Sequence, residues 1–319
     1  MENKILGLHH ITAIAGQAQR NYDFYTGVLG LRLVKKTVNF DDPGTYHFYY
    51  GDEIGSPGSI LTFFPWEGIQ KGRVGTGMAT EIGYSVPAGS LDFWEMHFKT
   101  LGVSHRRQAV RFDEPFIQFE DRDGLMLTLN VPAATDNRPS WTTRDVSTAA
   151  AIKGFHSVTL TLRDREPTAE VLSGILGYRL QAREGNRYRF TTNAIETAHI
   201  IDILEEPDGR YGINAGGTNH HVAFRVKDDN VLMEVRNKVL AAGLHITEKI
   251  DRQYFYSLYF REPGGVLFEL ASDNPGFVID EQLEELGTHL LLPPQYEPMR
   301  ERIEESLPPL RQNSEDHAH

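Results

Sequence analysis

The sequence of 319 residues contains no cysteine. Disulfide bonds, metal sites built from thiolates and cysteine nucleophiles are therefore excluded. The sequence also lacks any run of about 18 apolar residues, the length that a membrane-spanning helix needs. The segment MENKILGLHH at the start has no apolar stretch of the kind found in secretory signals. From these absences we expect a cytoplasmic protein that does not bind a membrane.

Basic residues are outnumbered in this chain. It has 32 lysines and arginines against 44 aspartates and glutamates, which gives a net charge of −12. A nucleic-acid-binding domain usually carries a basic face, so nucleic acid is not an expected partner. Hydrophobic residues make up 40% of the chain, which is enough for a substantial core. The composition leaves the oligomeric state open, a homo-oligomer included.

One pattern of elements occurs four times along the chain. A strand, a helix and then two or three strands are predicted over residues of about 7–65, 78–132, 153–206 and 219–273. The segment GLHHITAIA at Gly7 corresponds to GFHSVTLTL at Gly154, and VLGLRLV corresponds to ILGYRLQ. Gly30 and Gly177 then fall at the end of a helix, where a positive φ favours glycine.

The repeats predict an α+β fold made of four βαβββ modules. We expect two domains, 1–132 and 153–275, a polar linker at 133–152 and a tail at 276–319. The tail contains one amphipathic stretch, PMRERIEESL, and ends in histidines that we expect to be disordered. This plan resembles the vicinal oxygen chelate superfamily over nearly the whole chain. In that superfamily, which includes glyoxalase I and extradiol dioxygenases, paired modules curl their strands into cups that can hold a metal.

Two histidine doublets, His9 with His10 and His220 with His221, lie at matching positions of the first and fourth modules. For one doublet, core packing or capping of a strand end is the alternative, but recurrence at equivalent positions favours metal ligation. The alignment favours the second histidine of each doublet as the ligand. Because adjacent strand residues point to opposite faces, His9 and His220 would flank the cup and contact the substrate or the ligands.

Glu269 interrupts the apolar run GGVLFELA, where a central strand should be hydrophobic. An unpaired buried carboxylate is costly, and a metal would stabilise it as the anion. The alternative is an exposed glutamate on a half-buried strand. Two imidazoles with one carboxylate form the ligand set of non-haem Fe(II) oxygenases. We therefore expect one metal per chain, bound by His10, His221 and Glu269.

The second and third modules serve as an internal control. The positions that match the three ligands there are Ser157, Glu81 and Thr128, which do not make a metal site. His156 matches His9 and is interpreted as structural. The single metal is therefore expected in a cup built from the first and fourth modules.

Several motifs, in order, resemble the hydroquinone-cleaving branch of the ring-cleaving dioxygenases. They are GLHHITAIAG, YHFYYGDEIGSPGSILTFFP, KGRVGTG, GFHSVTL, GGTNHHVAF and SLYFREPGGVLFE. The resemblance implies Fe(II) as cofactor, with Mn(II) allowed by the same donors, and it implies the same three ligands. It also implies roles in the pocket for His9, Thr12, His220, Arg252 and Tyr259. Arg252 would hold a phenolate and Tyr259 would orient oxygen or substrate; a surface arginine and a packed strand tyrosine are the alternatives.

The implied function is Fe(II)-dependent cleavage of hydroquinones with O2, in the detoxification or degradation of quinones and other aromatics. A glyoxalase-type lyase is the alternative, and its cup usually carries a fourth protein ligand. When PGGVLFEL is aligned with PGSILTFF, that position is Phe63, which leaves the site with three ligands. A third interpretation is a binding protein without enzymatic activity. The ring substituents, iron versus manganese, and the roles of His47, His156 and the tail are left open.

Overall fold

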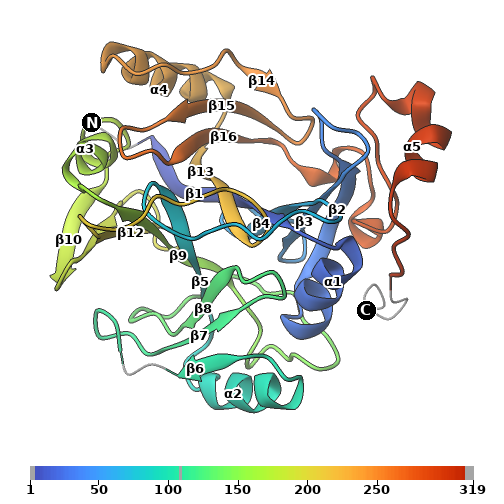
Figure 1. Ribbon diagram of the computed structural model, residues 1–319, viewed down its shortest axis with the longest axis horizontal. Helices are drawn as coiled ribbons and strands as arrows, with labels where there is room; N and C mark the ends of the chain where they lie inside the picture. The colour runs from blue at the N-terminus through green and yellow to red at the C-terminus, as the bar shows by residue number, and fades with distance from the viewer. Residues whose placement is uncertain (1–3, 108–109, 313–319) are drawn as a thin grey trace.

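Two mixed β-sheets of eight strands each form the body of the molecule (Figure 1). The computed structural model describes residues 4–107 and 110–312. The first and fourth modules together form one sheet, and the second and third modules form the other. This arrangement confirms the predicted α+β fold of four modules paired into two cups.

The first sheet has the strand order β14-β15-β16-β13-β1-β4-β3-β2. Its strands are β1 (Ile5–Ala15), β2 (Arg32–Val38), β3 (Tyr46–Gly51), β4 (Ile60–Pro65), β13 (Thr218–Val226), β14 (Ile250–Asp251), β15 (Phe255–Arg261) and β16 (Leu267–Pro275). At its centre β1 and β13 are antiparallel, and each has a parallel neighbour, β4 beside β1 and β16 beside β13.

The second sheet repeats this plan in the order β10-β11-β12-β9-β5-β8-β7-β6. Its strands are β5 (Met78–Ser85), β6 (His105–Arg107), β7 (Phe116–Glu120), β8 (Met126–Asn130), β9 (Gly154–Leu162), β10 (Arg179–Glu184), β11 (Arg187–Thr191) and β12 (Ile200–Glu205). The antiparallel pair β5 and β9 corresponds to β13 and β1, so the two sheets have the same internal symmetry.

A helix follows the first strand of every module. The helices are α1 (Ala18–Tyr22) continued by the π-helical turn η1 (Asp23–Val28), α2 (Leu91–Thr100), α3 (Glu166–Glu170) continued by η2 (Val171–Ile175), and α4 (Asp229–Ala241). Gly30 and Gly177 follow the two π-helical turns with φ of 65° and 74°, which confirms that these glycines end helices. The carboxylate of Asp228 accepts a hydrogen bond from the backbone N–H of Val231 and caps α4. None of the described helices is both long and apolar enough to cross a bilayer.

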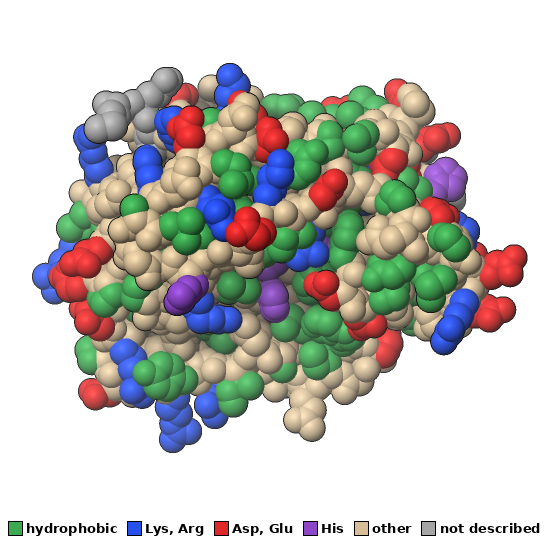
Figure 2. Space-filling view, turned by 90° about the horizontal axis from the view of Figure 1, so that it is seen from above, with side chains coloured by type: hydrophobic (Ala, Val, Ile, Leu, Met, Phe, Trp, Pro, Cys, Tyr) green, Lys and Arg blue, Asp and Glu red, His purple; other side chains and the backbone are tan. Residues whose placement is uncertain are grey.

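A single large cluster of buried apolar side chains contains residues from both sheets and from the helices. Trp94 of α2, Phe155 of β9 and Phe224 of β13 all belong to it and are fully buried. Removal of such surface from water is the main drive for folding. Acidic and basic side chains are interspersed over the face in Figure 2 and are not gathered by sign.

Residues after β16 pack along β2, the edge strand of the first sheet. They form η3 (Phe277–Ile279), η4 (Leu283–Glu285), η5 (Glu297–Met299) and α5 (Arg300–Ser306). The backbone N–H of Leu291 donates to the carbonyl of Lys36 at 3.0 Å, so the tail covers an edge that would otherwise be open to pairing. Figure 1 shows α5 at this end of the molecule. The histidines for which we expect disorder, in residues 313–319, lie outside the described residues.

Residues 133–152 form neither helix nor strand, as expected of a connecting segment. Each sheet nevertheless takes one module from each side of this segment. The two expected domains, 1–132 and 153–275, therefore stay a prediction about how the sequence is divided, and they do not correspond to the two sheets.

Candidate metal centre

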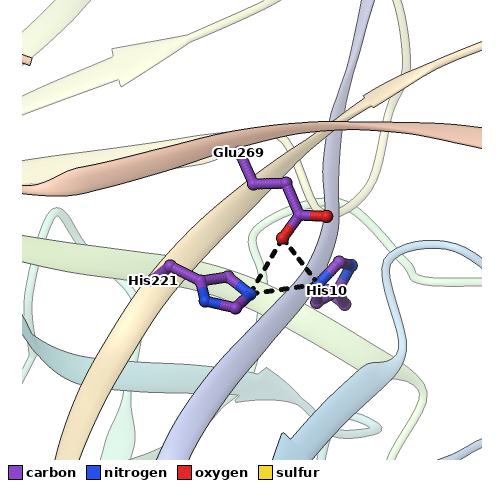
Figure 3. A group of neighbouring side chains, drawn as sticks. All are labelled: His10, His221 and Glu269. Atoms are coloured by element: carbon purple, nitrogen blue, oxygen red, sulfur yellow. Dashed lines mark hydrogen bonds and ion pairs between the residues drawn. The ribbon is translucent and has the colours of Figure 1, made fainter. Parts of the chain in front are cut away.

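Three buried side chains converge on one point of the first sheet (Figure 3). Glu269 Oε2 lies 3.1 Å from His10 Nε2 and 2.8 Å from His221 Nε2. The two Nε2 atoms are 3.3 Å apart. This is the only group of three or more such side chains, among the residues that the structure describes, that could hold a metal ion.

The pairing of the three central strands brings these side chains together. His10 of β1 lies opposite Ala223 of β13, and Ala223 lies opposite Glu269 of β16. His221 is two residues before Ala223, so its side chain is on the same face of the sheet. Three rigid strands therefore present one donor each to the same side, which keeps the donors in position without help from loops.

The spacing of the donors fits a metal ion. Ligands bound at about 2.1 Å and at right angles to one another are separated by about 3 Å, and the three separations here are 2.8, 3.1 and 3.3 Å. Glu269 Oε2 is buried and has no hydrogen-bond donor of suitable geometry among the described residues. A cation between the three atoms would satisfy this oxygen and the two imidazole nitrogens together.

The first histidine of each doublet contacts the second through Nδ1. The Nδ1 atoms of His9 and His10 are 3.0 Å apart, and those of His220 and His221 are 2.8 Å apart. One hydrogen must lie between each pair of nitrogens. When His10 and His221 supply it, each keeps a lone pair on Nε2, which is the tautomer that binds a metal.

Burial keeps the outer histidines neutral, so that they can accept this hydrogen. Burial, together with the charge of His10, lowers the pKa of His9 well below its usual value. Burial and the charge of His221 lower the pKa of His220 to about 4. Neutral imidazoles at these positions can therefore fix the ring orientation of both ligating histidines.

Glu269 is held as the anion. Burial alone would raise the pKa of Glu269, but the charges of His10 and His221 beside it keep that pKa well below its usual value. The hydroxyl of Ser257 donates to the second oxygen, Oε1. Because Ser257 bonds to Oε1, Oε2 is the atom of Glu269 that faces the two imidazoles. Nothing in the sequence pattern marks Ser257 as a residue of this site.

A pocket of about 260 Å³ opens beside His10 and His221. It is lined further by Thr12, Asn39, Phe40, Asp41, His47, Tyr49, Phe64, Trp66, His220, Arg252, Phe255, Tyr259 and Leu267. The structure thus brings Thr12, His220, Arg252 and Tyr259 into one cavity. It places His9 elsewhere: this ring packs behind His10 and against Phe255, with ring centroids 5.1 Å apart from each.

Arg252 and Tyr259 form one side of the pocket. Tyr259 lies directly opposite Glu269 in the β15–β16 pair, and its ring packs against that of His221 at 5.6 Å. Burial lowers the pKa of Arg252, but Tyr259, Glu269 and Asp41 together raise it and the net shift is upward, so the guanidinium stays charged. Burial raises the pKa of Tyr259 well above its usual value, so this side chain remains a neutral hydroxyl. A permanent cation and a neutral phenol therefore face any ligand bound here.

Three other residues of the pocket, Thr12, His47 and Tyr49, belong to a chain of hydrogen bonds that the sequence does not predict. The hydroxyls of Thr12 and Thr62 are 2.8 Å apart, and Thr62 Oγ1 is 3.0 Å from His47 Nε2. The other ring nitrogen of His47 is 2.9 Å from the hydroxyl of Tyr49. All four side chains are buried. His47 lies in the run YHFYY, and no feature of that sequence pattern predicts that it belongs to a functional site.

The prediction that Phe63 is the counterpart of Glu269 is wrong by one residue. In the fourth module Ala223, two residues after His221, lies opposite Glu269. In the first module the residue two after His10 is Thr12, and it lies opposite Thr62. Phe63 is fully buried and packs against Tyr25, with ring centroids 4.6 Å apart, so it belongs to the core and does not shelter the site.

The shift of one residue arose because the Pro-Gly of PGGVLFEL was aligned with the Pro-Gly of PGSILTFF. The residues that correspond in conformation are the left-handed glycines four positions earlier, Gly58 with φ of 90° and Gly265 with φ of 103°. Because strand side chains alternate between faces, a slip of one residue exchanges the cup and the core. Alignment of the second glycine of PGG with Gly58 would have identified Thr62.

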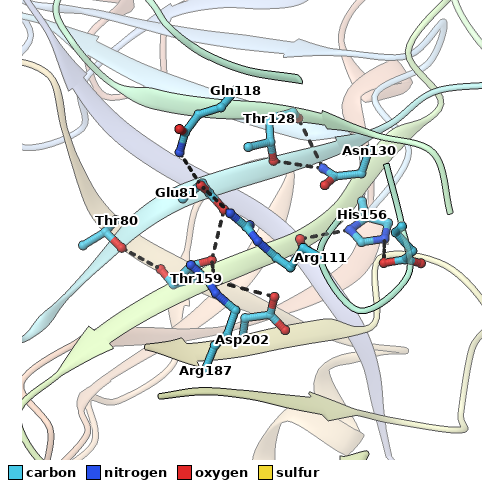
Figure 4. A network of polar contacts seen from close by, with 12 residues as sticks. Thr80, Glu81, Arg111, Gln118, Thr128, Asn130, His156, Thr159, Arg187 and Asp202 are labelled. Atoms are coloured by element: carbon cyan, nitrogen blue, oxygen red, sulfur yellow. Dashed lines mark hydrogen bonds and ion pairs between the residues drawn. The ribbon is translucent and has the colours of Figure 1, made fainter. Parts of the chain in front are cut away.

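The second sheet has no metal ligands at the equivalent positions. Ser157 lies opposite Gly83, and Gly83 lies opposite Thr128, which reproduces the register of the first sheet. Glu81, at the position of His221, forms an ion pair with Arg111 and accepts a hydrogen bond from Gln118 at 3.0 Å (Figure 4). A network of charged side chains therefore stands where the first sheet has its histidines.

His156 is part of this second site. Its Nδ1 is 3.0 Å from the hydroxyl of Ser157, and its Nε2 is 3.1 Å from the carboxylate of Glu114. Glu114 also accepts a hydrogen bond from Arg189 at 2.6 Å. These contacts pair His156 within the protein, in keeping with a structural role.

Comparisons with known proteins agree with this geometry. The model of the Glyoxalase/Bleomycin resistance protein/Dioxygenase superfamily matches residues 7–129 and 154–270. The chain is 44% identical to "Putative ring-cleaving dioxygenase MhqO" of Bacillus subtilis over 309 residues, which cover 97% of this chain and 98% of the relative. It is 34% identical to the chlorohydroquinone/hydroquinone 1,2-dioxygenase of Sphingobium indicum over 311 residues, 95% and 96% of the two chains.

Solved structures show the same fold. The crystal structure of a Bacillus subtilis protein described as a "putative dioxygenase" superposes with a TM-score of 0.93 at 43% identity, over 97% of this chain and 98% of the other. Glyoxalase I from Zea mays superposes with a TM-score of 0.63 at 16% identity, over 89% and 97%. At that identity the second likeness concerns the fold alone.

Proposed function

The chain belongs to the glyoxalase, bleomycin resistance protein and dioxygenase superfamily, and on that basis we propose that it is a ring-cleaving dioxygenase that acts on hydroquinones. The observation that carries the proposal is the convergence of His10, His221 and Glu269 beside a small pocket with aromatic walls. The names of two relatives, a ring-cleaving dioxygenase and a hydroquinone 1,2-dioxygenase, support the reaction and the substrate class.

We propose Fe(II) as the metal. Two imidazoles and one carboxylate on one face are the donors that non-haem Fe(II) oxygenases use, and Mn(II) accepts the same set. Fe(II) held here would supply the electron transfer that O2 needs before it can react with a closed-shell aromatic ring. Among the described residues three donors converge here, which would leave coordination positions for the substrate and O2.

The pocket residues fit a hydroquinone. A volume of about 260 Å³ has room for a single substituted ring between the aromatic walls. Arg252 offers a permanent positive charge to a phenolic oxygen that loses its proton. Tyr259 offers a neutral hydroxyl that can donate to a bound oxygen atom. His220 lines the same pocket and can exchange a proton near the metal.

The correction at Phe63 does not restore a glyoxalase-type ligand set. Thr62, the true counterpart of Glu269, is a neutral hydroxyl that already bonds to Thr12 and His47. The first module therefore adds no carboxylate to the metal, and the likeness to glyoxalase I at 16% identity concerns the fold alone. No feature of the described site favours the lyase.

Oxygen consumption tests this proposal. The protein is reconstituted with Fe(II) under argon and then assayed in an oxygen electrode with methylhydroquinone, with catechol and with the methylglyoxal–thiol adduct. We expect O2 uptake to match ring opening mole for mole with methylhydroquinone, and no turnover under argon. Conversion of the thiol adduct without O2, with hydroquinones left untouched, would establish the lyase and end the dioxygenase proposal.

A further inference from the structure

The hydrogen-bond chain Thr12, Thr62, His47 and Tyr49 has no counterpart in the second sheet. The position of Thr62 is held there by Asp202, which lies opposite Thr159 as Thr62 lies opposite Thr12. The positions of Tyr49 and His47 are held by Arg189 and Arg187, since Arg189 lies opposite Asp202 as Tyr49 lies opposite Thr62. The second sheet thus has permanently charged side chains at the positions where the first sheet has groups that can pass a proton.

The hydrogen-bond chain begins at Thr12, where the far side of a bound hydroquinone ring would lie. Thr12 is two residues from His10 on the same face of β1, which places it about 7 Å farther along the strand. In a hydroquinone the two hydroxyls are on opposite sides of the ring. When one oxygen binds at the metal, the other is directed away from it, toward the part of the pocket that Thr12, His47 and Tyr49 line.

We propose that His47 accepts the proton of this far hydroxyl, which reaches it through Thr12 and Thr62. The inference rests on the proposed hydroquinone activity. Ring opening needs the far oxygen to release its proton as its electron pair enters the ring. The proton passes to Thr12 Oγ1, the hydroxyl hydrogen of Thr12 passes to Thr62 Oγ1, and that of Thr62 passes to His47 Nε2. One proton leaves the substrate and one arrives at His47, and the same path returns it to the product.

This direction of transfer defines the hydrogen positions. Nε2 of His47 must have a free lone pair, so the hydrogen of the neutral ring is on Nδ1 and is donated to the hydroxyl oxygen of Tyr49 at 2.9 Å. Tyr49 is the positioning residue of this hydrogen-bond chain, because its hydroxyl oxygen lies where it can accept the Nδ1 hydrogen. The ring of Phe277 packs against Tyr49 at 5.2 Å and supports it from the side of the tail.

The surroundings of His47 keep it available as an acceptor. Burial first, then the charges of His10, His221 and Arg252, lower its pKa well below the usual value, and Glu269 opposes them only in part. The ring is therefore neutral at pH 7. Phe64 packs against it at 4.4 Å, and the hydroxyls of Thr62 and Thr12 connect its Nε2 to the part of the pocket that Thr12 lines.

Substitution of Thr62 tests the relay. Thr62→Val keeps the shape and removes the hydroxyl, and we expect it to lower kcat for methylhydroquinone about 100-fold, the size of a typical general-base contribution. KM and iron content should stay as in the wild type. Thr62→Ser restores the hydroxyl and should recover most of the loss. Thr128→Val is the control, because Thr128 is an equally buried threonine on β8 of the second sheet and lies outside the relay.

A comparison of two substrates provides a second measurement, because a purely structural defect would lower kcat for both of them equally. A chlorinated hydroquinone has more acidic hydroxyls and needs less help to lose a proton, so Thr62→Val should affect it much less than methylhydroquinone. For the same reason kcat of Thr62→Val with methylhydroquinone should rise with pH, while the wild type changes little. Equal losses for both substrates, or no loss with either, would overturn the relay.

The tautomer of His47 can be measured without turnover. The zinc-loaded protein with ¹⁵N-labelled histidine is studied by NMR, and His47→Gln identifies the His47 signals. We expect a neutral ring with its hydrogen on Nδ1, and a hydrogen on Nε2 would overturn the relay even in an active enzyme. Failure of the wild type to open hydroquinones would instead overturn the proposed function together with the substrate named here.

Discussion

In each histidine doublet the two side chains differ in role because a single hydrogen lies between their Nδ1 atoms, so that one ring donates it and the other accepts it. The inner ring, His10 or His221, turns Nε2 toward Glu269, and its Nδ1 faces a neutral neighbour that can accept the hydrogen. Two adjacent imidazoles would thus make one metal ligand with a defined tautomer. With His10 and His221 as the proposed ligands, this arrangement would account for the two doublets, one for each histidine donor.

Removal of the carboxylate should empty the metal site. Glu269→Ala takes away the carboxylate among the three described donors and leaves the two imidazoles, so we expect loss of most of the bound iron, measured by metal analysis of the purified protein. Glu81→Ala is the control, since it removes a buried carboxylate from the second sheet. Full iron occupancy in Glu269→Ala would show that the metal is bound elsewhere.

Removal of an outer histidine should affect turnover and not metal content. In His9→Ala and in His220→Ala the inner ligand keeps its Nε2 but loses the partner of its Nδ1, and groups that support ligands in this way contribute about 10- to 100-fold to activity. We expect iron to be retained and kcat to fall by such a factor. If His9→Ala or His220→Ala loses iron while His10→Ala or His221→Ala retains it, the ligand within that doublet is the other histidine.

At the scale of elements, the alternation of side chains along each strand decides which residues reach the cup. The doublets and Glu269 could be placed from the sequence because each is unusual in its surroundings. Thr62 could not be placed, since Phe63 and Phe64 beside it fit the same apolar strand pattern, and only the pairing of β1 with β4 shows which of the three lies opposite Thr12. Ser257 and His47 are likewise ordinary strand residues until β15 and β3 are placed beside the site.

The tail and β2 are joined by a buried charge cluster. Lys35 is fully buried, and its ammonium group contacts the carboxylates of Asp280, at 2.7 Å, and Glu281. Lys35→Met removes the cation that faces the buried carboxylate of Glu281, and the loss of one partner of a buried ion pair typically costs about 3 to 5 kcal/mol. We expect a loss of this size in the free energy of unfolding, measured by urea denaturation.

The exposed Lys99 of α2 provides the comparison for this substitution. Lys99→Met should change stability by no more than about 0.5 kcal/mol, as is usual at the surface. A Lys35→Met variant as stable as the Lys99→Met variant would mean that the tail is held to β2 by its backbone and apolar contacts alone.

At the scale of the whole molecule, the two sheets are tied together by buried polar contacts as well as by the core. Asp121, in the turn between β7 and β8 of the second sheet, accepts a hydrogen bond from the hydroxyl of Tyr25 at 2.9 Å. Tyr25 belongs to η1, which is part of the first module. Burial raises the pKa of Asp121 to about 6, against a usual value of 3.8.

This shift predicts a pH dependence of stability. Because the folded-state pKa is raised, the folded protein binds a proton that the unfolded chain has released. The stabilisation is full below pH 3.8 and is lost as the pH rises through about 6. Asp121→Asn cannot ionise, so its stability relative to the wild type should increase by about 2 kcal/mol between pH 4 and pH 7.

Urea denaturation at a series of pH values measures this difference. Asp145→Asn, at an exposed position, should show no comparable change relative to the wild type. If the difference between Asp121→Asn and the wild type is independent of pH, Asp121 is ionised in the fold and its contact with Tyr25 is that of a carboxylate.

The sequence by itself determined the four modules, the helix-ending glycines and the two doublets with Glu269, because each leaves a local signal: a repeat, a glycine with positive φ or a polar residue in an apolar run. Only the tertiary structure decided which side chains of the other strands lie on the same face of the sheet as His10, His221 and Glu269. The pairing of the first module with the fourth spans more than 200 residues of sequence, and the register of β4 against β1 selects Thr62 over Phe63. Such registers depend on contacts between distant strands, and a shift of one residue leaves the local sequence pattern unchanged while it turns every side chain to the opposite face.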